Sequence, residues 1–321
     1  MRFLLTEEQR DFGRSLRGLL AAAEVPAVVR AWSAGDHGPG RAVWGRLART
    51  GVFALAADEA EPLPVELAVA FVELGRAGMP GPVVETVAAA VLLGRLGDEE
   101  LAKRLLPGLA DGGAVATLTL PGGSPYALDA DAAAYCLTVS RAGELRSAGA
   151  GASVASLDPA RRLSVPVAAG PALAAGAAVS AAARAALDWA RLLTAAQCLG
   201  VGEALLARTV AYAKERTQFG APIGSFQAVK HRLADTLLAL EFARPLLFAA
   251  ALSLDPGEVA AAKLAAGGAA YGAALTALQL HGAIGYTEEL DLSLWLRKAR
   301  PLRDAWGTPA ACREAVLAGR R

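Results

Sequence analysis

A series of long helical segments in the carboxyl-terminal part of the chain is the feature that most constrains its fold. Between residues 181 and 215, apolar side chains such as Leu187, Leu199 and Val210 recur at the spacing of one helical face. The same periodicity continues through the residues 225–252, 258–279, 288–300 and 309–319. Four long helices joined by short turns predict an up-and-down four-helix bundle.

The first part of the chain also has helical periodicity, and a short β-rich segment separates the two helical parts. Thr6 is expected to cap the first helix, because two acids follow it in the first turn. After Asp111 the pattern changes to short β-branched stretches at 114–120, 134–139 and 162–167. We therefore predict a mainly α fold with a small β domain, divided into an N-terminal helical domain (1–110), a reduced β domain (111–179) and a C-terminal bundle (180–321).

The composition narrows the class of protein. Lys and Arg (32) balance Asp and Glu (31), which argues against a nucleic-acid protein because phosphate binding needs a basic surface. Two uncharged runs, 163–183 and 264–287, are long enough to span a bilayer, but their prolines, glycines and alanines make them poor spans. The start of the chain is charged and has no secretory pattern. We expect a cytoplasmic protein without a membrane span, whose many alanines favour closely packed helices.

Cysteine and histidine are too few and too scattered to build a metal site. Cys136, Cys198 and Cys312 are odd in number and far apart, which predicts neither a disulfide framework nor a metal cluster. The three histidines have no ligand spacing either. We expect a protein without a metal.

The most informative segment is 215–227, with the sequence ERTQFGAPIGSFQ. A helix is expected to end at Arg216, Gly220 permits a turn, and Ser225 can cap the next helix. The forked guanidinium of Arg216 suits a pyrophosphate, and Gln218 adds a further polar group. On the residues alone, an ordinary helix–turn–helix corner with a solvated arginine is an equally good interpretation.

A second segment, 278–288, has the sequence LQLHGAIGYTE. Gln279 ends an alanine- and glycine-rich helix, and the small residues after it let a ligand approach the backbone. Thr287 is expected to cap the following helix. For His281 alone, an imidazole that fills a surface gap is the simpler interpretation.

Together the two segments resemble the acyl-CoA dehydrogenase family of flavoproteins. The resemblance rests on the pair RTQFG-x-PI-x-x-FQ and Q-x-HG-x-x-GYTE and on their spacing, with weaker support from LTEEQ at 5–9 and ELGRA at 73–77. It implies the acyl-CoA dehydrogenase fold, FAD as cofactor and an acyl-CoA thioester as substrate. It also implies α,β-desaturation of that thioester, with an electron-transfer flavoprotein as the acceptor.

In that family the two segments reach across a dimer interface and hold the pyrophosphate and adenosine of the FAD seated in the neighbouring subunit. The resemblance assigns this role to Arg216, Gln218, Phe219, Gln279 and Gly282. Ala283 stands where a second glycine is usual, which is a mild departure from the pattern.

The resemblance fails at the catalytic base. The reaction needs a carboxylate within reach of the proton α to the thioester. Most relatives place a Glu before a Gly-Thr near the carboxyl terminus, where this chain has Trp306, whose indole nitrogen only donates. Other relatives place a Glu before an Arg early in the first bundle helix, and Ala190 stands there. Asp304 is expected to point in the wrong direction, so we assign no catalytic residue.

The β segment departs from the family as well, because the residues that support the flavin ring in relatives have no match between 126 and 139. The chain thus lacks the ring support and the base but keeps the residues that hold a neighbour's FAD. This combination predicts a non-catalytic subunit of a heteromeric enzyme, completed by a longer homologue that bears the catalytic Glu. The chain is most similar to the short subunits of actinobacterial heterotetrameric acyl-CoA dehydrogenases that act on sterol side-chain or other bulky thioesters.

Two alternatives remain open at this point. One is a homomeric flavoenzyme of the same fold with a different reaction and an unrecognised base. The other is a non-enzymatic helical scaffold that binds no flavin. The sequence does not name the acyl group, because pocket-lining and core residues have the same apolar composition.

Overall fold

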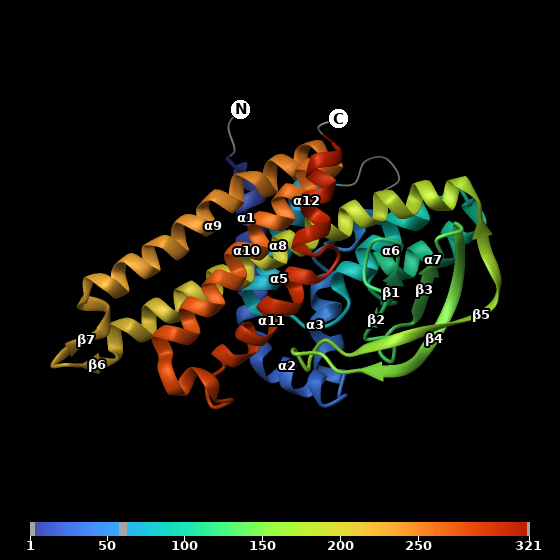
Figure 1. Ribbon diagram of the computed structural model, residues 1–321. Helices are drawn as coiled ribbons and strands as arrows, with labels where there is room; N and C mark the ends of the chain where they lie inside the picture. The colour runs from blue at the N-terminus through green and yellow to red at the C-terminus, as the bar shows by residue number, and fades with distance from the viewer. Residues whose placement is uncertain (1–3, 58–62, 320–321) are drawn as a thin grey trace.

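The computed structural model describes residues 4–57 and 63–319 (Figure 1). Its amino-terminal helices are α1 (Glu7–Ala21), α2 (Val25–Ser33), α3 (Gly38–Ala48), α4 (Ala54–Ala57), α5 (Pro64–Ala77), α6 (Val83–Arg95) and α7 (Glu99–Ala110). Thr6 caps α1 as predicted: its hydroxyl accepts from the Gln9 backbone N–H at 3.2 Å, and Gln9 Oε1 accepts from the Thr6 N–H at 3.0 Å. This reciprocal pair satisfies two backbone donors that the first turn would otherwise leave unpaired.

A single five-stranded sheet follows the first helices. Its strands are β1 (Ala116–Thr119), β2 (Ala127–Leu128), β3 (Tyr135–Val139), β4 (Glu144–Val154) and β5 (Leu163–Ala175), in the order β1-β3-β4-β5-β2. β1 and β3 are parallel, the other pairs are antiparallel, and α6 packs against β1. The sequence pattern missed β2 and β4. β2 has only two residues, and β4 is mostly Ala, Gly and Ser, which have little intrinsic preference for strands.

The rest of the chain is the helical bundle, drawn in yellow to red in Figure 1. It contains α8 (Ala177–Glu215), the hairpin strands β6 (Thr217–Gln218) and β7 (Ala221–Pro222), the 3₁₀ turn η1 (Ile223–Ser225), α9 (Gln227–Ser253), α10 (Pro256–His281), the 3₁₀ turn η2 (Gly282–Tyr286), α11 (Leu292–Asp304) and α12 (Pro309–Ala318). The architecture is therefore mainly α with a small sheet, as the sequence predicted. α8 begins three residues before the boundary that we propose at 180.

Two predicted helix caps are wrong. The Ser225 hydroxyl donates to the Pro222 carbonyl at 2.7 Å inside η1, so Phe226 takes the N-cap position of α9 without a side-chain bond. The Thr287 hydroxyl donates back to the Ile284 carbonyl at 3.0 Å, and α11 begins only at Leu292. In both places the hydroxyl belongs to a tight turn, and this local bond competes with capping of the next helix.

Helices α5 and α8 approach each other closely through glycine. A Cβ on Gly200 would stand 1.9 Å from the Val72 carbonyl oxygen, and a Cβ on Gly75 would stand 2.2 Å from the Gln197 carbonyl oxygen. Only glycine fits at either position, because real Cβ atoms do not approach a backbone oxygen this closely. The composition suggested closely packed helices, and α5 and α8 pack in this way where they cross. This contact connects the amino-terminal helices to the bundle.

Neither of the two uncharged runs forms one continuous helix, as a bilayer span would. Residues 163–183 are divided between β5 and the start of α8, while 264–287 is divided between α10 and η2. Within the described residues, α8 and α9 are the helices whose length and composition would allow them to cross a membrane. In the most apolar window of α8, 78% of the residues are buried, whereas in that of α9 only 39% are buried. α8 is therefore the core helix of the bundle, and α9 has an open side.

Candidate functional site

The two motif segments lie at the same end of the bundle. The Tyr212 ring near the end of α8 stacks on the His281 ring at the end of α10, with centroids 4.1 Å apart and an interplanar angle of 20°. The Tyr212 hydroxyl also donates to the His281 carbonyl at 3.4 Å. Residues 69 positions apart in the chain are thus joined, and β6, β7 and η2 project together from this end (Figure 1).

The first segment forms a tight hairpin that presents its side chains to solvent. Arg216 ends α8, and its carbonyl accepts from the Ile223 N–H at 2.8 Å, which closes the hairpin. Phe219 and Gly220 form the two-residue turn with φ values of 55° and 77°. Positive φ at both central residues is the geometry of a type I′ turn, whose twist matches the flanking strands.

Phe219 is held in an unfavourable state in two respects. A bulky residue rarely adopts a positive φ, and this ring is 93% exposed. The Phe226 ring lies 6.2 Å away between centroids, in an edge-on arrangement. Strain of this kind concentrates at ligand sites. Two exposed rings and an exposed arginine in one short segment are the side-chain types that suit a planar base and a phosphate.

The second segment contributes a backbone edge. α10 ends at His281, and Gly282 follows with φ 62° and ψ −139°, a backbone conformation that favours glycine. The space where a Gly282 Cβ would stand is open, so a ligand can approach the backbone there. Gln279 is exposed one turn earlier on α10. Gln279, Gly282, Arg216, Gln218 and Phe219 are all exposed at this end of the bundle, and we call them together the hairpin site.

His281 has a structural role beside the hairpin site. Its ring is buried, and Nδ1 lies 2.8 Å from the Ala277 carbonyl oxygen. Burial lowers the pKa of this imidazole, so the neutral form is favoured. The imidazole fills a gap under Tyr212 and fixes the end of α10, close to the simpler interpretation that the sequence allowed.

A second feature lies at Trp306, the position at which the resemblance would place a catalytic base. Trp306 is 3% exposed and adopts a positive φ of 58°. Its indole Nε1 donates to Glu85 Oε1 at 3.0 Å, and its carbonyl accepts from Arg191 Nε at 3.0 Å. A Cβ on Gly123 would stand 2.8 Å from the indole ring. Groups from α6, α8 and the loop after β1 therefore lie against Trp306: Glu85 and Gly123 lie beside the indole, and Arg191 bonds the backbone carbonyl.

Glu85, the buried acid that bonds Trp306, was not expected from the sequence pattern. It is the one acid in α6, where every residue from Val83 to Leu93 is buried. Burial raises the pKa of its carboxyl group, while the nearby Arg161 and the Trp306 indole act in the opposite direction. A single acid in an apolar helix was the available signal, since such a group has to find a partner inside the protein.

The other candidate base positions hold no free carboxylate. Ala190 lies within α8 and is completely buried. Asp304 pairs with Arg300 at 3.2 Å on the exposed side of α11. The cavity beside Glu85 and Arg161 has a volume of about 10 Å³, which is room for no more than one water molecule. No acyl chain fits between Glu85 and Trp306 in this conformation.

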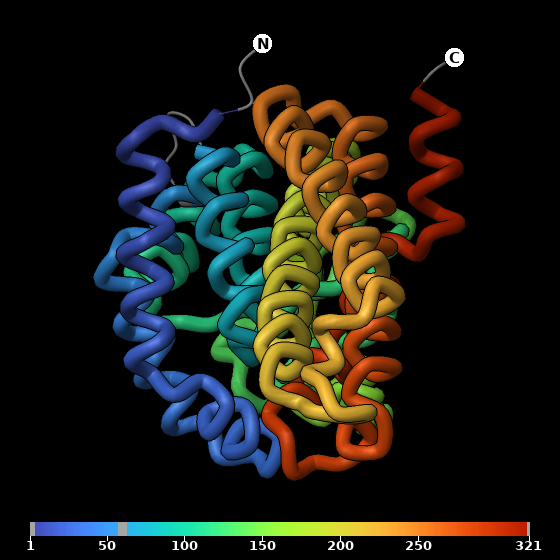
Figure 2. Tube along the Cα trace, turned by 90° about the vertical axis from the view of Figure 1, so that its left-hand side faces the viewer, coloured from blue at the N-terminus to red at the C-terminus, as the bar shows by residue number. Residues whose placement is uncertain are grey.

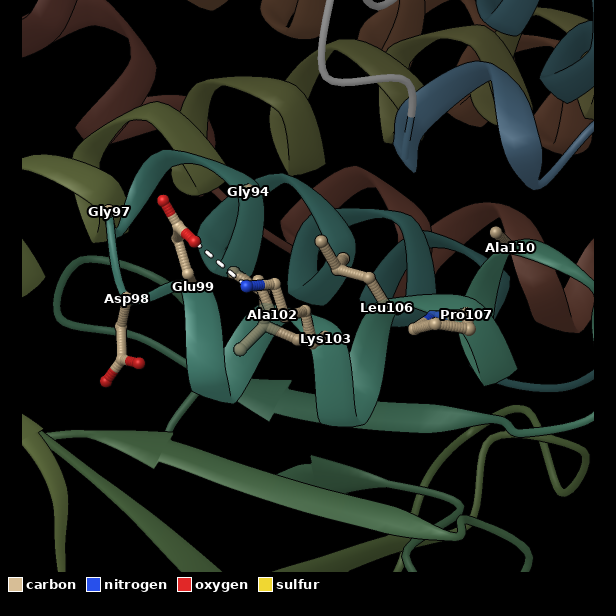
Figure 3. A pocket seen from close by; sticks show the side chains of 10 residues that line it. Gly94, Gly97, Asp98, Glu99, Ala102, Lys103, Leu106, Pro107 and Ala110 are labelled. Atoms are coloured by element: carbon tan, nitrogen blue, oxygen red, sulfur yellow. Dashed lines mark hydrogen bonds and ion pairs between the residues drawn. The ribbon is translucent and has the colours of Figure 1, made fainter.

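A larger groove, of about 860 Å³, lies between the end of α6 and α7 (Figure 3). Its lining combines small and apolar residues such as Ala102 and Leu106 with the ion pair Lys103–Glu99 at 2.9 Å. This groove lies on α6 and α7, far from β6 and β7 at the other end of the molecule (Figure 1). Volume alone therefore does not identify the site here.

Comparisons with known proteins agree with the fold. The family model described as "Acyl-CoA dehydrogenase, N-terminal domain" matches residues 6–113, and "Acyl-CoA dehydrogenase, C-terminal domain" matches residues 180–319. Acyl-CoA dehydrogenase IpdE2 of Mycobacterium tuberculosis is 34% identical over 306 residues, which is 91% of this chain and 91% of that protein.

Solved structures share the fold over nearly the whole chain. The Tcur3481-Tcur3483 steroid ACAD variant has a TM-score of 0.84 at 24% identity and covers 98% of this chain and 97% of that one. The ChsE4-ChsE5 complex of Mycobacterium tuberculosis has a TM-score of 0.81 at 22% identity, with coverage of 99% and 98%. A glutaryl-CoA dehydrogenase of Mycobacterium smegmatis, solved with FADH2, has a TM-score of 0.81 at 18% identity, with coverage of 98% and 94%.

Proposed function

This chain belongs to the acyl-CoA dehydrogenase family, whose enzymes are FAD-dependent oxidoreductases of the CH–CH bond of acyl-CoA, and we propose that it is a non-catalytic subunit of such an enzyme. Its hairpin site would hold the pyrophosphate and adenosine of an FAD whose flavin ring lies in a longer homologue. That homologue would carry the catalytic Glu, bind the acyl-CoA and pass electrons to an electron-transfer flavoprotein.

The observation that carries this proposal is the contrast between two places in the molecule. At position 306, where the resemblance places the base, Trp306 is buried and bonded to Glu85, so this position offers no carboxylate to a substrate. At the hairpin site, Phe219 is 93% exposed and Arg216 is exposed as well, so both can meet a ligand. A homomeric enzyme would need both places to be functional in one chain, whereas a heteromer needs only the second.

The residues of the hairpin site fit an FAD. Arg216 provides a fixed fork of donors for a pyrophosphate, Phe219 and Phe226 provide aromatic surface for the adenine, and the open backbone at Gly282 allows close approach. FAD, when bound, supplies the hydride acceptor of the reaction. The contribution of this chain is to bind and orient the adenosine end.

The substrate proposal follows from the relatives. One solved neighbour is described as a steroid ACAD and another as a complex of two different chains. A bulky, sterol-type thioester agrees with an enzyme in which one subunit type gives up its own acyl site. We therefore propose a bulky acyl-CoA, including a sterol side-chain thioester, as the substrate class.

The other candidate is a homomeric flavoenzyme that uses Glu85 as its base. The observation in its favour is that the Glu85 carboxyl is buried and its pKa is raised. Against it, Trp306 occupies one oxygen of Glu85, and the adjoining cavity has room for one water at most. The heteromer needs no rearrangement of these residues.

The test is co-expression with a longer homologue that has an intact base, followed by measurement of bound FAD per complex. Arg216→Ala should weaken FAD retention roughly tenfold to a hundredfold, because a hydrogen bond to a charged group is worth about 1.5–3 kcal/mol. Arg313→Ala on the exposed side of α12 is the matched control and should retain FAD. Unchanged FAD content in Arg216→Ala, or yellow and active protein from this chain alone, would refute the proposal.

A further inference from the structure

The connection between β4 and β5 lies partly inside the protein. Residues 155–162 join Val154 and Leu163, which face each other at the end of the two strands. They enter a crevice between the amino-terminal helices, blue and cyan in Figure 2, and the yellow-to-red bundle. The ladder has a register shift between Ala150 and Ser153, and such a bulge bends the strands. We call residues 155–162 the β4–β5 loop.

Alternate residues of the β4–β5 loop point inward. Asp158 and Ala160 are 2% and 1% exposed, whereas Leu157 is 62% exposed and Pro159 is exposed as well. Loops usually run over the surface, and an aspartate is rarely buried unless it has a partner. The burial of Asp158 and Ala160 therefore shows that this loop fills a space between other elements.

Helices from both helical parts of the chain form the walls of the crevice. Together with loop residues, it is lined by apolar and polar side chains: Met79, Val83, Leu302, Glu85, Gln197 and Lys298. With the loop in place, a cavity of about 10 Å³ remains, which holds one water molecule at most. The loop thus occupies nearly all of the space beside Glu85.

Asp158 is held as a bound carboxylate would be. One of its oxygens accepts from Lys298 Nζ at 2.8 Å, and the other accepts from the Ala160 backbone N–H at 3.0 Å. Lys298 is 5% exposed, and among the described residues Asp158 is the one acid paired with it. A buried ammonium group needs an anion. Lys298 would therefore bind another carboxylate if Asp158 were removed.

The filled crevice adjoins the position at which the resemblance would place a catalytic base. Glu85 lines the crevice and accepts from the Trp306 indole at 3.0 Å. The loop also supplies a compensating charge, because the guanidinium of Arg161 opposes the rise that burial causes in the pKa of Glu85. The β4–β5 loop and Trp306 thus both restrict access to the same carboxyl group.

We propose that the β4–β5 loop is an internal plug, in which Asp158 occupies a carboxylate site on Lys298 and closes the crevice to other molecules. The open crevice would take a carboxylate with an apolar tail, because Lys298 supplies the cation while Met79, Val83 and Leu302 supply apolar walls. This inference does not depend on the proposed FAD site. Gln197 lies nineteen residues before Arg216, which corresponds to about 28 Å along a helix.

The first test empties the carboxylate site but keeps the loop. Asp158→Gly removes a CH₂–COO⁻ group, so the gap has the size of acetate. Acetate at about ten times its Kd should raise the melting temperature of this variant by about 2–4 °C, or restore folding if Asp158→Gly unfolds without it, because acetate binds only the folded state. Sodium chloride at the same ionic strength should have no such effect, which separates binding from screening.

Two variants serve as controls for the acetate effect. Asp131→Gly removes a 40% exposed carboxylate that pairs with Arg162 at 2.5 Å, and acetate should not change its melting temperature. Asp158→Gly combined with Lys298→Met removes both buried charges, so this variant should fold without acetate and should not respond to it.

The second test removes the plug itself. Because Val154 and Leu163 face each other, the two-residue turn Asn-Gly can join them in place of residues 155–162. In isothermal titration calorimetry, this shortened chain should bind octanoate about tenfold or more tightly than the native chain does. Lys298→Met in the shortened chain should weaken that binding by about tenfold or more, which is the contribution of one hydrogen bond between charged groups.

Three results would overturn the inference. They are an Asp158→Gly variant that acetate neither stabilises nor refolds, a folded shortened chain that binds octanoate no more tightly than the native chain, and octanoate binding that Lys298→Met leaves unchanged. Asp158→Gly should retain FAD in the complex with the longer homologue, because the hairpin site is distant from the crevice. Absence of FAD from the native complex would refute the proposed function alone, since the acetate and octanoate results do not depend on it.

Discussion

Replacement of Trp306 tests whether this side chain closes the base position and joins the three parts of the chain. Trp306 is 3% exposed; its indole bonds Glu85 of α6 and lies against Gly123 in the loop after β1, and its backbone carbonyl bonds Arg191 of α8. Truncation of a buried tryptophan to alanine costs about 3–5 kcal/mol, from lost burial and the cavity that remains. Trp306→Ala should therefore lose a large part of the about 5–15 kcal/mol by which a native protein is stable.

Two further variants separate the contributions to that loss. Trp306 has a φ of 58°, where a non-glycine residue pays about 1–2 kcal/mol, so Trp306→Gly should be about 1 kcal/mol more stable than Trp306→Ala. Trp306→Phe keeps most of the apolar surface but leaves the Glu85 carboxyl without its donor, at a cost of about 1–3 kcal/mol. The double variant Trp306→Phe with Glu85→Leu should lose less stability than the two single variants lose in sum, by about 0.5–3 kcal/mol.

The assay is urea unfolding of the chain followed by circular dichroism, with and without added indole. Indole should raise the midpoint of Trp306→Gly, because it can occupy the vacated space and binds only the folded state. Leu317→Ala, at a 63% exposed position on α12, is the control and should change stability by less than about 0.5 kcal/mol. A midpoint of Trp306→Ala equal to that of the native chain, or Gly and Ala variants of equal stability, would refute the reasoning.

Three further predictions concern other parts of the molecule. Phe219→Gly should leave urea stability equal or slightly higher, because φ is 55° there, yet lower the FAD content of the complex; unchanged FAD would exclude a role for the ring. Burial raises the pKa of Asp129 from 3.8 to about 7, so the folded state favours the protonated form. The free energy of unfolding should therefore fall by on the order of 4 kcal/mol as the pH rises from about 4 to 7, and it should level off above pH 7. Asp129→Asn should flatten this profile in urea titrations at successive pH values, and the same slope in both proteins would contradict it. The Asp158 carboxylate is 2% exposed and lies 2.8 Å from the Lys298 ammonium. Lys298→Met should lower the free energy of unfolding in urea by about 3–5 kcal/mol, because it leaves this carboxylate as an unpaired buried charge. A loss below about 1 kcal/mol would show that water reaches the carboxylate.

Much of the architecture could be predicted because helix formation is a local property of the chain. The stripes that begin at Leu187 and continue into the later helices place α8, α9 and α10 within a few residues of their observed bounds. The strands were harder, because β4 is built from Ala, Gly and Ser and is stabilised by its neighbours instead of by its own composition. The caps at Ser225 and Thr287 were mispredicted because a hydroxyl chooses among several backbone partners, and only the folded turn decides which one it meets.

The sequence by itself determined the family resemblance, the residues offered for the cofactor and the absence of a Glu at positions 190 and 306, because each of these depends on which side chain stands at a place in a motif. The tertiary structure decided what the motifs do together. It joined the ends of α8 and α10 through Tyr212 and His281, buried Trp306 against Glu85 from another helix, and left large apolar side chains of α9 exposed. These features depend on contacts between residues far apart in the chain, which the spacing of residues along a single helix does not encode.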